Sequence, residues 1–267
     1  MPKIWDSALL LPKLARLASR VPKNPHHAWE NYWAGITRTG KDGEVLWDAA
    51  AESERLSYLA PIKEHFDPAL PVVDIGCGNG TYTRWLATLF PQVLGVDVSA
   101  SAIRRAQAEA EAEAEGIRDV EFAAMDAVAD GAGDLLRERL GGSANVFLRG
   151  VLHVLKPQEQ ARLAANLHTL AGEQGRVFLA ETNFQGNRFQ YVGHLGATRH
   201  GIPHPLRRAI EGLPMPGHFG QRELTAVFPA SKWQLLADGP AVIEAVPMKQ
   251  DSVTEQIPGY FAVLQTN

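Results

Sequence analysis

The sequence predicts an α/β protein with a doubly wound, mostly parallel sheet and helices on both faces of that sheet. Short apolar runs alternate with helical segments between residues 72 and 180, as in consecutive βαβ units. The first run leads into a glycine-rich loop at residues 76–80, and the next two runs end in Asp97 and Asp126. Because parallel strands end at one edge of a sheet, these three features are expected to line one site.

Five apolar runs predict the buried parallel strands, at residues 72–75, 93–98, 120–124, 145–148 and 176–180. The segments between them carry helical signals. Pro157 suits a first helical position, and the leucines that follow it form an apolar stripe. Ser99 or Ser101 suits the cap of an Ala/Glu-rich helix at residues 102–115. Two more strand-like runs follow, at residues 233–246, with an interruption at 238–240, and at residues 260–265.

The chain is predicted to divide into an N-terminal helical cap, residues 1–65, and a main domain, residues 66–267. Residues 2–21 have the leucine spacing of an amphipathic helix, and residues 49–65 are typical of a second helix. Four large aromatic residues between them form either a cap over the site or a separate small core: Trp29, Tyr32, Trp33 and Trp47. Residues 184–220 combine Gly, Pro, His and aromatic residues with little periodicity, which favours a substrate-side insertion or lid.

Composition narrows the class of partner. The 267 residues suffice for one large domain, with ordinary hydrophobic (45%) and charged (21%) contents. The net charge of −4 disfavours a nucleic-acid partner, because phosphate binding usually needs a basic face. Cys77 is the only cysteine, which excludes an internal disulfide and a cysteine-built zinc site. The N-terminal apolar run is too short for a membrane span and lacks a secretory cleavage pattern, so a cytoplasmic protein is expected.

Two histidines in the C-terminal half are candidate metal ligands. His200 and His204 have a spacing that a metal could use. They lie, however, in the Gly/Pro-rich stretch, where such spacing carries little weight. No metal site is predicted.

The strand ends together predict an adenosine-containing cofactor. Glycines let a ligand approach the backbone closely, and the helix after the loop offers unpaired N–H groups. Asp97, about twenty residues further on, can accept both ribose hydroxyls, and Asp126 is within reach of an adenine amino group. The loop spacing is G-x-G-x-G, with Thr81 in the place of the third dinucleotide glycine, and no G-K-[ST] ending follows. These features disfavour both a dinucleotide and a nucleoside triphosphate.

At this point the sequence resembles the class I S-adenosylmethionine-dependent methyltransferases of the Rossmann-like, small-molecule type. Residues 72–81 (VVDIGCGNGT) resemble their first motif and residues 96–99 (VDVS) their second. Residues 125–127 and 148–153 resemble the later cofactor-facing segments. The resemblance covers residues 72–183 and implies S-adenosylmethionine as cofactor, with S-adenosylhomocysteine as product. It also implies a seven-stranded sheet that ends in an antiparallel hairpin.

The resemblance carries roles over to individual positions. The backbone at Gly76 and Gly78 would meet the methionine portion, Asp74 would shape the loop from beneath, and the backbone at Arg149 and Gly150 would reach the methionine amino group. The expected cofactor-binding set is Asp74, Gly76, Cys77, Gly78, Gly80, Thr81, Asp97, Val98, Met125, Asp126, Ala127, Arg149 and Gly150.

His153, just after the fourth strand, is the candidate general base; the alternative is a histidine packed at a helix start. Arg149 could orient an acidic substrate or pair with a carboxylate. The candidate substrate contacts are Tyr32, Trp33, Trp47, Glu181, Tyr191, His194 and His218.

The predicted function is methyl transfer to a small organic acceptor at oxygen, nitrogen or carbon. One alternative is a nucleic-acid or protein methyltransferase, although no Pro-Pro-aromatic motif follows the fourth strand. Another is a cofactor-binding homologue that does not methylate, such as a cyclase-like enzyme. The sequence does not identify the acceptor or the methylated atom, and it leaves a homodimer open.

Overall fold

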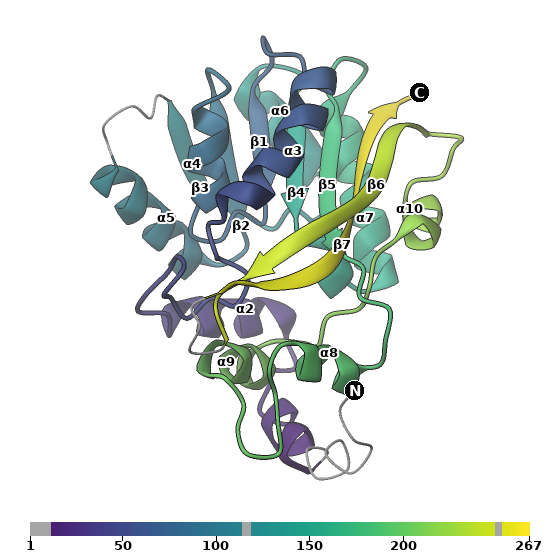
Figure 1. Cartoon of the computed structure of the whole chain (residues 1–267). Helices are drawn as coiled ribbons and strands as arrows, with labels where there is room; N and C mark the ends of the chain where they lie inside the picture. Colours follow the sequence, from purple (N-terminus) through teal and green to yellow (C-terminus); the bar gives the residue numbers. More distant parts are fainter. Residues whose placement is uncertain (1–11, 114–118, 249–252) are drawn as a thin grey trace.

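The computed structural model describes residues 12–113, 119–248 and 253–267 of the chain. A seven-stranded sheet with the order β3-β2-β1-β4-β5-β7-β6 forms its centre (Figure 1). The strands are β1 (Val72–Ile75), β2 (Val93–Asp97), β3 (Val120–Ala124), β4 (Asn145–Arg149), β5 (Val177–Thr182), β6 (Trp233–Ala245) and β7 (Glu255–Thr266). The first five pair in parallel, and β7 pairs antiparallel with both β5 and β6. The predicted fold class is confirmed.

Helices cover both faces of the sheet, because successive strand residues point to opposite sides. On one face, Tyr58 and Ile62 of α3 (Glu52–His65) and Leu86 of α4 (Thr81–Ala87) pack against Phe147 and Phe178. On the other face the leucines of α7 (Pro157–Ala171) and of α6 (Ala132–Leu140) pack against the β4 residues on either side of Phe147. In Figure 1, α3 lies in front of the sheet and α7 behind it. Two further helices lie beside the sheet: α5 (Ala100–Ala112) packs on β2 and β3, and α10 (Gln221–Val227) packs against α7.

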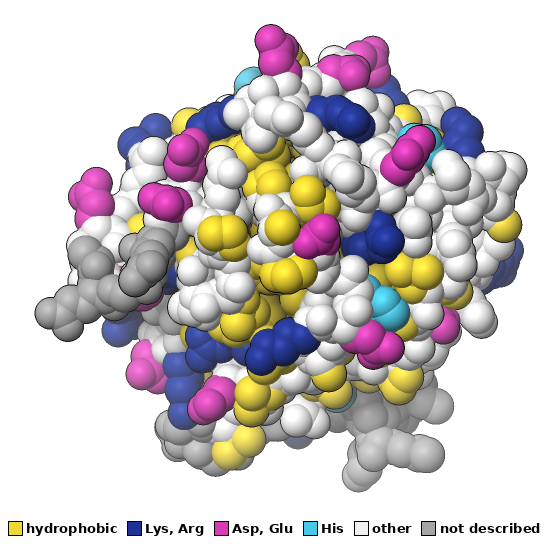
Figure 2. Space-filling view, turned by 90° about the horizontal axis from the view of Figure 1, so that it is seen from above, with side chains coloured by type: hydrophobic (Ala, Val, Ile, Leu, Met, Phe, Trp, Pro, Cys, Tyr) yellow, Lys and Arg dark blue, Asp and Glu magenta, His cyan; other side chains and the backbone are white. Residues whose placement is uncertain are grey.

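A second layer lies at the carboxyl ends of the parallel strands (Figure 1). It contains α2 (Pro25–Ala34), α8 (Arg188–His194) and α9 (His204–Gly212). Apolar residues of α8 and α9, among them Val192, Leu206 and Ile210, share a small core with Ile243 of β6 and Ile257 of β7. Figure 2 shows the opposite face, at the amino ends of the strands, where hydrophobic side chains gather near the centre and charged side chains lie around them.

Several boundaries differ from the prediction. The run at 233–246 is one unbroken strand with a bulge between Leu235 and Ala237, and Pro240 is tolerated because β6 is an edge strand. The last strand begins at Glu255, five residues before the predicted run. The helices α2, α6, α8 and α9 were not predicted. Of the predicted helix at 2–21, residues 1–11 lie outside the described residues, and residues 12–18 are helical. No helix among the described residues is long and apolar enough to span a membrane.

Candidate functional site

A cavity of about 730 Å³ lies between the carboxyl ends of the strands and the second layer. Its volume is in the range typical of small-molecule and cofactor sites. Nine of the expected cofactor-binding residues line it: Gly76, Gly78, Asp97, Val98, Met125, Asp126, Ala127, Arg149 and Gly150. Asp74, Cys77 and Thr81 instead line a smaller cavity of about 40 Å³ beside the glycine loop, and Gly80 lines neither of the two.

The glycine loop has a backbone that only glycine adopts easily. Gly76, Gly78 and Gly80 have φ angles of 74°, 55° and 77°. A Cβ atom on Gly76 would lie 2.6 Å from a methyl group of Val151, and one on Gly78 would lie 2.8 Å from the ring of Trp33. The glycine loop is therefore enclosed between the turn that follows β4 and the N-terminal cap.

Two buried side chains, Asp74 and Cys77, lie at the base of this loop. Asp74 accepts a hydrogen bond from the Thr83 hydroxyl at 2.6 Å, and burial raises the pKa of Asp74 to about 7. Burial also raises the pKa of the Cys77 thiol well above its usual value, so this thiol stays protonated. The arrangement agrees with the supporting position expected of Asp74 and gives Cys77 no nucleophilic character.

Asp97 is the buried carboxylate on the cavity wall. Its two oxygens accept hydrogen bonds from the backbone N–H groups of Gly78 (3.0 Å) and Ser99 (2.9 Å). Burial raises the pKa of Asp97 to about 6. The negative charge of Glu30 raises this pKa further, whereas the two backbone hydrogen bonds lower it. Each carboxylate oxygen retains a second lone pair, which suits the two hydroxyls of a ribose.

Asp126 lies at the far end of the same wall. One of its oxygens accepts from the Val128 backbone N–H at 2.9 Å, and the other lies 3.3 Å from Nε2 of His26 in the cap. Met125, Ala127 and Val128 surround it in the cavity lining. A flat heterocycle with an amino group fits this combination of apolar side chains and one acceptor.

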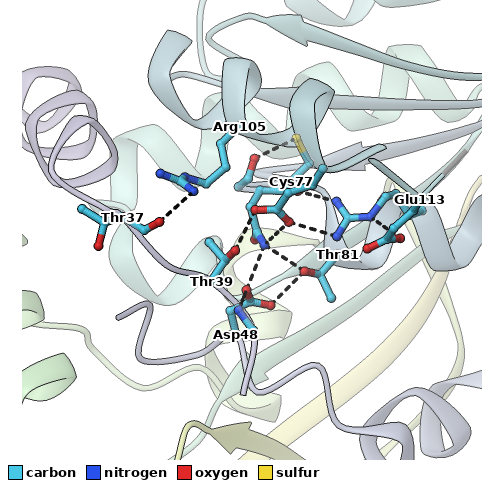
Figure 3. A network of polar contacts seen from close by, with 12 residues as sticks. Thr37, Thr39, Asp48, Cys77, Thr81, Arg105 and Glu113 are labelled. Atoms are coloured by element: carbon cyan, nitrogen blue, oxygen red, sulfur yellow. Dashed lines mark hydrogen bonds and ion pairs between the residues drawn. The ribbon is translucent and has the colours of Figure 1, made fainter. Parts of the chain in front are cut away.

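The cap is fastened to the glycine loop by a buried carboxylate, Asp48 (Figure 3). Asp48 accepts hydrogen bonds at 2.9 Å from the Asn79 amide and the Thr81 hydroxyl of the loop, and at 2.8 Å from the Gly40 backbone N–H. Thr39 adds a hydrogen bond from the cap to Glu109 of α5 at 2.7 Å. Neither Asp48 nor this fastening was predicted from the sequence.

A second fastening joins α2 to the helix after β2. The Glu30 carboxylate accepts from the hydroxyls of Ser99 (2.7 Å) and Ser101 (2.5 Å) and from the Ser101 backbone N–H (3.1 Å). These hydrogen bonds lower the pKa of Glu30 to about 2, so it stays ionised at neutral pH. The charge lies at the N-terminus of α5, where a helix favours an anion.

His153 lines the cavity, and Glu181 lies directly behind it. Nδ1 of His153 is 2.5 Å from Glu181, whose carboxylate also accepts from the backbone N–H groups of Val151, Leu152 and His153. Glu181 is completely buried and does not line the cavity, so the structure does not place it where a substrate contact was expected. It fixes both the turn after β4 and the orientation of the histidine ring.

Arg149 pairs with a carboxylate, which answers a question that the sequence left open. Its guanidinium makes a bidentate ion pair with Glu54 of α3 and lies 4.7 Å from the centre of the Tyr82 ring. Glu54 also accepts from the Tyr58 hydroxyl and from the backbone of Glu244. Arg149 therefore ties α3 to the sheet, and its charge is already neutralised.

The expected substrate residues divide into two groups. Trp33, Trp47 and Tyr191 line the cavity. Tyr32 is buried against Trp47, with ring centres 5.5 Å apart, and does not line it. His194 hydrogen-bonds the Gln256 carbonyl and His218 lies 3.5 Å from Glu223, both outside the cavity lining.

Much of the lining was not predicted from the sequence. The additional residues come from α2, from α9 and the segment after it, and from the last two strands: His26, Leu206, Ile210, Met215, Ile243 and Ile257. No group of His, Cys, Asp and Glu in the described part of the chain is arranged to hold a metal ion.

Comparisons with known proteins agree with this geometry. Residues 72–175 match the family described as "Methyltransferase domain". The strychnine O-methyltransferase of Strychnos nux-vomica is 25% identical over 169 residues, which are 61% of this chain and 43% of that protein. The ubiquinone biosynthesis O-methyltransferase of Burkholderia thailandensis is 32% identical over 143 residues, 51% of this chain and 57% of that protein. The chain thus spans about half the length of these curated relatives.

A solved structure resembles nearly the whole chain. The crystal structure of an S-adenosylmethionine-dependent methyltransferase from Anabaena variabilis has a TM-score of 0.77 and 26% identity, covering 92% of this chain and 97% of that one. Because 92% of the chain is far more than residues 72–175, the likeness extends into the segments before and after the matched domain.

Proposed function

We propose that the chain, a class I S-adenosylmethionine-dependent methyltransferase by its matched domain and its fold, methylates a hydroxyl group of a small organic acceptor, with His153 as general base. The curated relatives named above are O-methyltransferases, and the net charge of −4 favours a small molecule over a nucleic acid. The proposal includes residues 1–65 and 184–220 as the elements that close over the main domain. It also includes a cytoplasmic location, since the lone buried cysteine requires no oxidising compartment.

The residues of the cavity suit the cofactor. We define the cofactor half of the cavity as the lining residues that follow β1 to β4: Gly76, Gly78, Asp97, Val98, Met125, Asp126, Ala127 and Gly150. Glycine backbone groups lie at one end of this half, and the buried carboxylate of Asp97 lies in the middle. At the other end, apolar residues surround the carboxylate of Asp126, which can accept a hydrogen bond. These suit the methionine, ribose and adenine portions in that order. When bound, S-adenosylmethionine supplies an activated methyl group, so positioning of the acceptor provides much of the acceleration.

The observation that supports O-methylation most directly is the His153–Glu181 pair. Because Glu181 accepts only, the proton of a neutral His153 ring is assigned to Nδ1, and the lone pair of Nε2 is left to accept a proton. Within the described residues, no group hydrogen-bonds Nε2. The buried carboxylate also stabilises the imidazolium that forms when an acceptor hydroxyl gives up its proton.

The test is His153→Ala with S-adenosylhomocysteine formation measured on a panel of phenols. We expect kcat to fall by about 100-fold to 10,000-fold, as for loss of a general base. The Kd for S-adenosylmethionine, measured by calorimetry, should change less than about twofold because the cofactor half is untouched. Glu181→Gln should lower kcat by less and alter the pH profile of kcat, because it changes the partner of the ring.

A matched control is His200→Ala, which removes an exposed histidine away from the cavity. Unchanged kcat in His153→Ala, with cofactor binding intact, would rule out the proposed base. Product mass and fragmentation would distinguish O-methylation from methylation at nitrogen or carbon.

A further inference from the structure

The charged groups of the cavity lining lie in the cofactor half or at the start of α7. Asp97 and Asp126 belong to the cofactor half, and Arg149 is paired with Glu54. Three more, Lys156, Glu159 and Arg162, come from the first two turns of α7. One turn further along this helix, the Asn166 amide hydrogen-bonds the carbonyls of Ala127 and Ala129, beyond β3. Asn166 thus holds the second half of α7 beside the loop after β3, while the three charged side chains at the start of the helix lie next to the turn that carries His153.

The rest of the lining is apolar. We define the acceptor half as the lining contributed by the cap, α8, α9 and the ends of β6 and β7, which includes Trp47, Val192, Leu206, Ile210, Ile243 and Ile257. His26 of the cap turns to the cofactor half, where its Nε2 lies 3.3 Å from Asp126. Apart from it, from His153 at the border and from the hydroxyl of Tyr191, this half has no ionisable side chain in the lining that the described residues provide. A charged acceptor would lose its hydration here without gaining a counter-charge, so its binding is strongly disfavoured.

Tyr191 is the polar exception in the acceptor half. Its ring meets the edge of Phe184, with ring centres 5.3 Å apart, and packs against the apolar core of α8 and α9. Its hydroxyl makes no hydrogen bond to any group in the described ranges. Burial raises the pKa of Tyr191 to about 12, so the hydroxyl remains a donor throughout the physiological pH range. A rigidly packed ring with an unused donor is suited to select an oxygen atom on the acceptor.

We propose that the acceptor is an uncharged molecule with an apolar body, and that Tyr191 donates a hydrogen bond to a second oxygen of that molecule, other than the one methylated. This inference rests on the proposed function, because it takes His153 as the group that faces the reacting hydroxyl. It assigns to Tyr191 the selection of the acceptor, separate from the chemistry at His153.

The experiment compares three matched probes by binding, in the presence of saturating S-adenosylhomocysteine. The probes are 2-methoxy-4-pentylphenol, 4-pentylphenol and 5-(4-hydroxy-3-methoxyphenyl)pentanoate, which differ in the second oxygen and in charge. Binding is measured by calorimetry and by quenching of tryptophan fluorescence, since Trp29, Trp33 and Trp47 line the cavity. We expect the uncharged methoxyphenol to bind at least about tenfold more tightly than the carboxylate, because the acceptor half provides no positive group to pair with the carboxylate.

Tyr191→Phe should weaken the binding of 2-methoxy-4-pentylphenol about fivefold, which corresponds to the loss of one neutral hydrogen bond. The binding of 4-pentylphenol should be unchanged. Its Kd for S-adenosylhomocysteine reports that the fold is intact. Equal or tighter binding of the carboxylate, equal weakening of both phenols, or no binding of either uncharged probe would overturn the proposal. Methyl transfer is measured separately on the same probes, so binding without transfer would count against the proposed function and not against the assignment of Tyr191.

Discussion

The cofactor half of the cavity is formed by short loops that directly follow β1 to β4, whereas the acceptor half is assembled from segments far apart in the sequence (Figure 1). In the cofactor half, backbone geometry and buried carboxylates such as Asp97 set the chemistry. In the acceptor half, the lining consists of apolar side chains of the cap, α8, α9, β6 and β7. These segments are far apart in the sequence and come together only through tertiary packing. One half is thus specified by local sequence and the other by packing, and variants in each should affect different constants.

The largest effect on cofactor binding should come from Asp97, because its removal leaves both the ribose site and the Gly78 N–H without an acceptor. We expect Asp97→Ala to weaken S-adenosylmethionine binding about 100-fold, from the loss of charge-assisted hydrogen bonds. Calorimetry measures this Kd, and thermal unfolding checks that the variant is folded. Asp130→Ala, a change at an exposed aspartate beyond β3, is the control and should bind normally.

The same residue should make cofactor binding depend on pH. The pKa of Asp97 is about 6, and the ionised form is the one that accepts two hydroxyl hydrogen bonds. Affinity should therefore be nearly constant above pH 7 and fall by roughly tenfold at pH 5, where only about a tenth of the carboxyl is ionised. The neighbouring Glu30, with a pKa of about 2, stays ionised throughout this range. The Asp97→Asn variant should lose this dependence; its persistence would place the titrating group elsewhere.

For the stability of the chain without cofactor, the expected pH dependence has the opposite sign to that of cofactor binding. The pKa of Asp97 is higher in the folded chain than in the unfolded chain, so the folded chain binds more protons between about pH 4 and pH 6. The contribution of Asp97 to the free energy of unfolding should therefore increase as pH falls through this window.

A smaller effect on cofactor binding is expected from Asp48, and it tests whether the cap contributes to the cofactor half. Asp48 lies in the cap but hydrogen-bonds Asn79 and Thr81 of the glycine loop. We expect Asp48→Asn to weaken cofactor binding about tenfold, because at least one of these charge-assisted bonds is lost. Amide hydrogen exchange at residues 76–81 should become faster at the same time. Asp42→Asn, at an exposed cap position, is the control; equal effects of the two changes would exclude a specific fastening.

The sequence was sufficient to predict the parallel sheet and the residues along its carboxyl edge. Short apolar runs and the glycine loop are local signals, so β1 to β5, Asp97 and Asp126 were found at their positions. The helices α8 and α9 were missed because residues 184–220 contain breakers, and their apolar faces become recognisable only once β6 and β7 provide the surface they cover. Pro240 similarly suggested a break that an edge strand does not need.

The partners of individual side chains were beyond the sequence. Arg149 and Glu54 are 95 residues apart, and Glu181 is 28 residues from His153. Nothing in the spacing of these residues distinguishes an ion pair or an orienting carboxylate from a substrate contact. Glu181 was therefore expected at the substrate, although its position behind His153 gives it an effect on the site through the histidine alone.

The smallest effect should be confined to the acceptor half. Ile210 of α9 is buried and lines the cavity, so Ile210→Val removes one methyl group from the acceptor surface. At about 0.8 kcal/mol for a buried CH₂, the KM for an apolar acceptor should rise about fourfold, while the Kd for S-adenosylmethionine stays constant. Ile62→Val makes the same deletion in the core under α3, away from the cavity, and should lower thermal stability without changing KM. A change in cofactor Kd in the Ile210 variant would mean that the two halves are coupled through packing, and the separation drawn between them would fail.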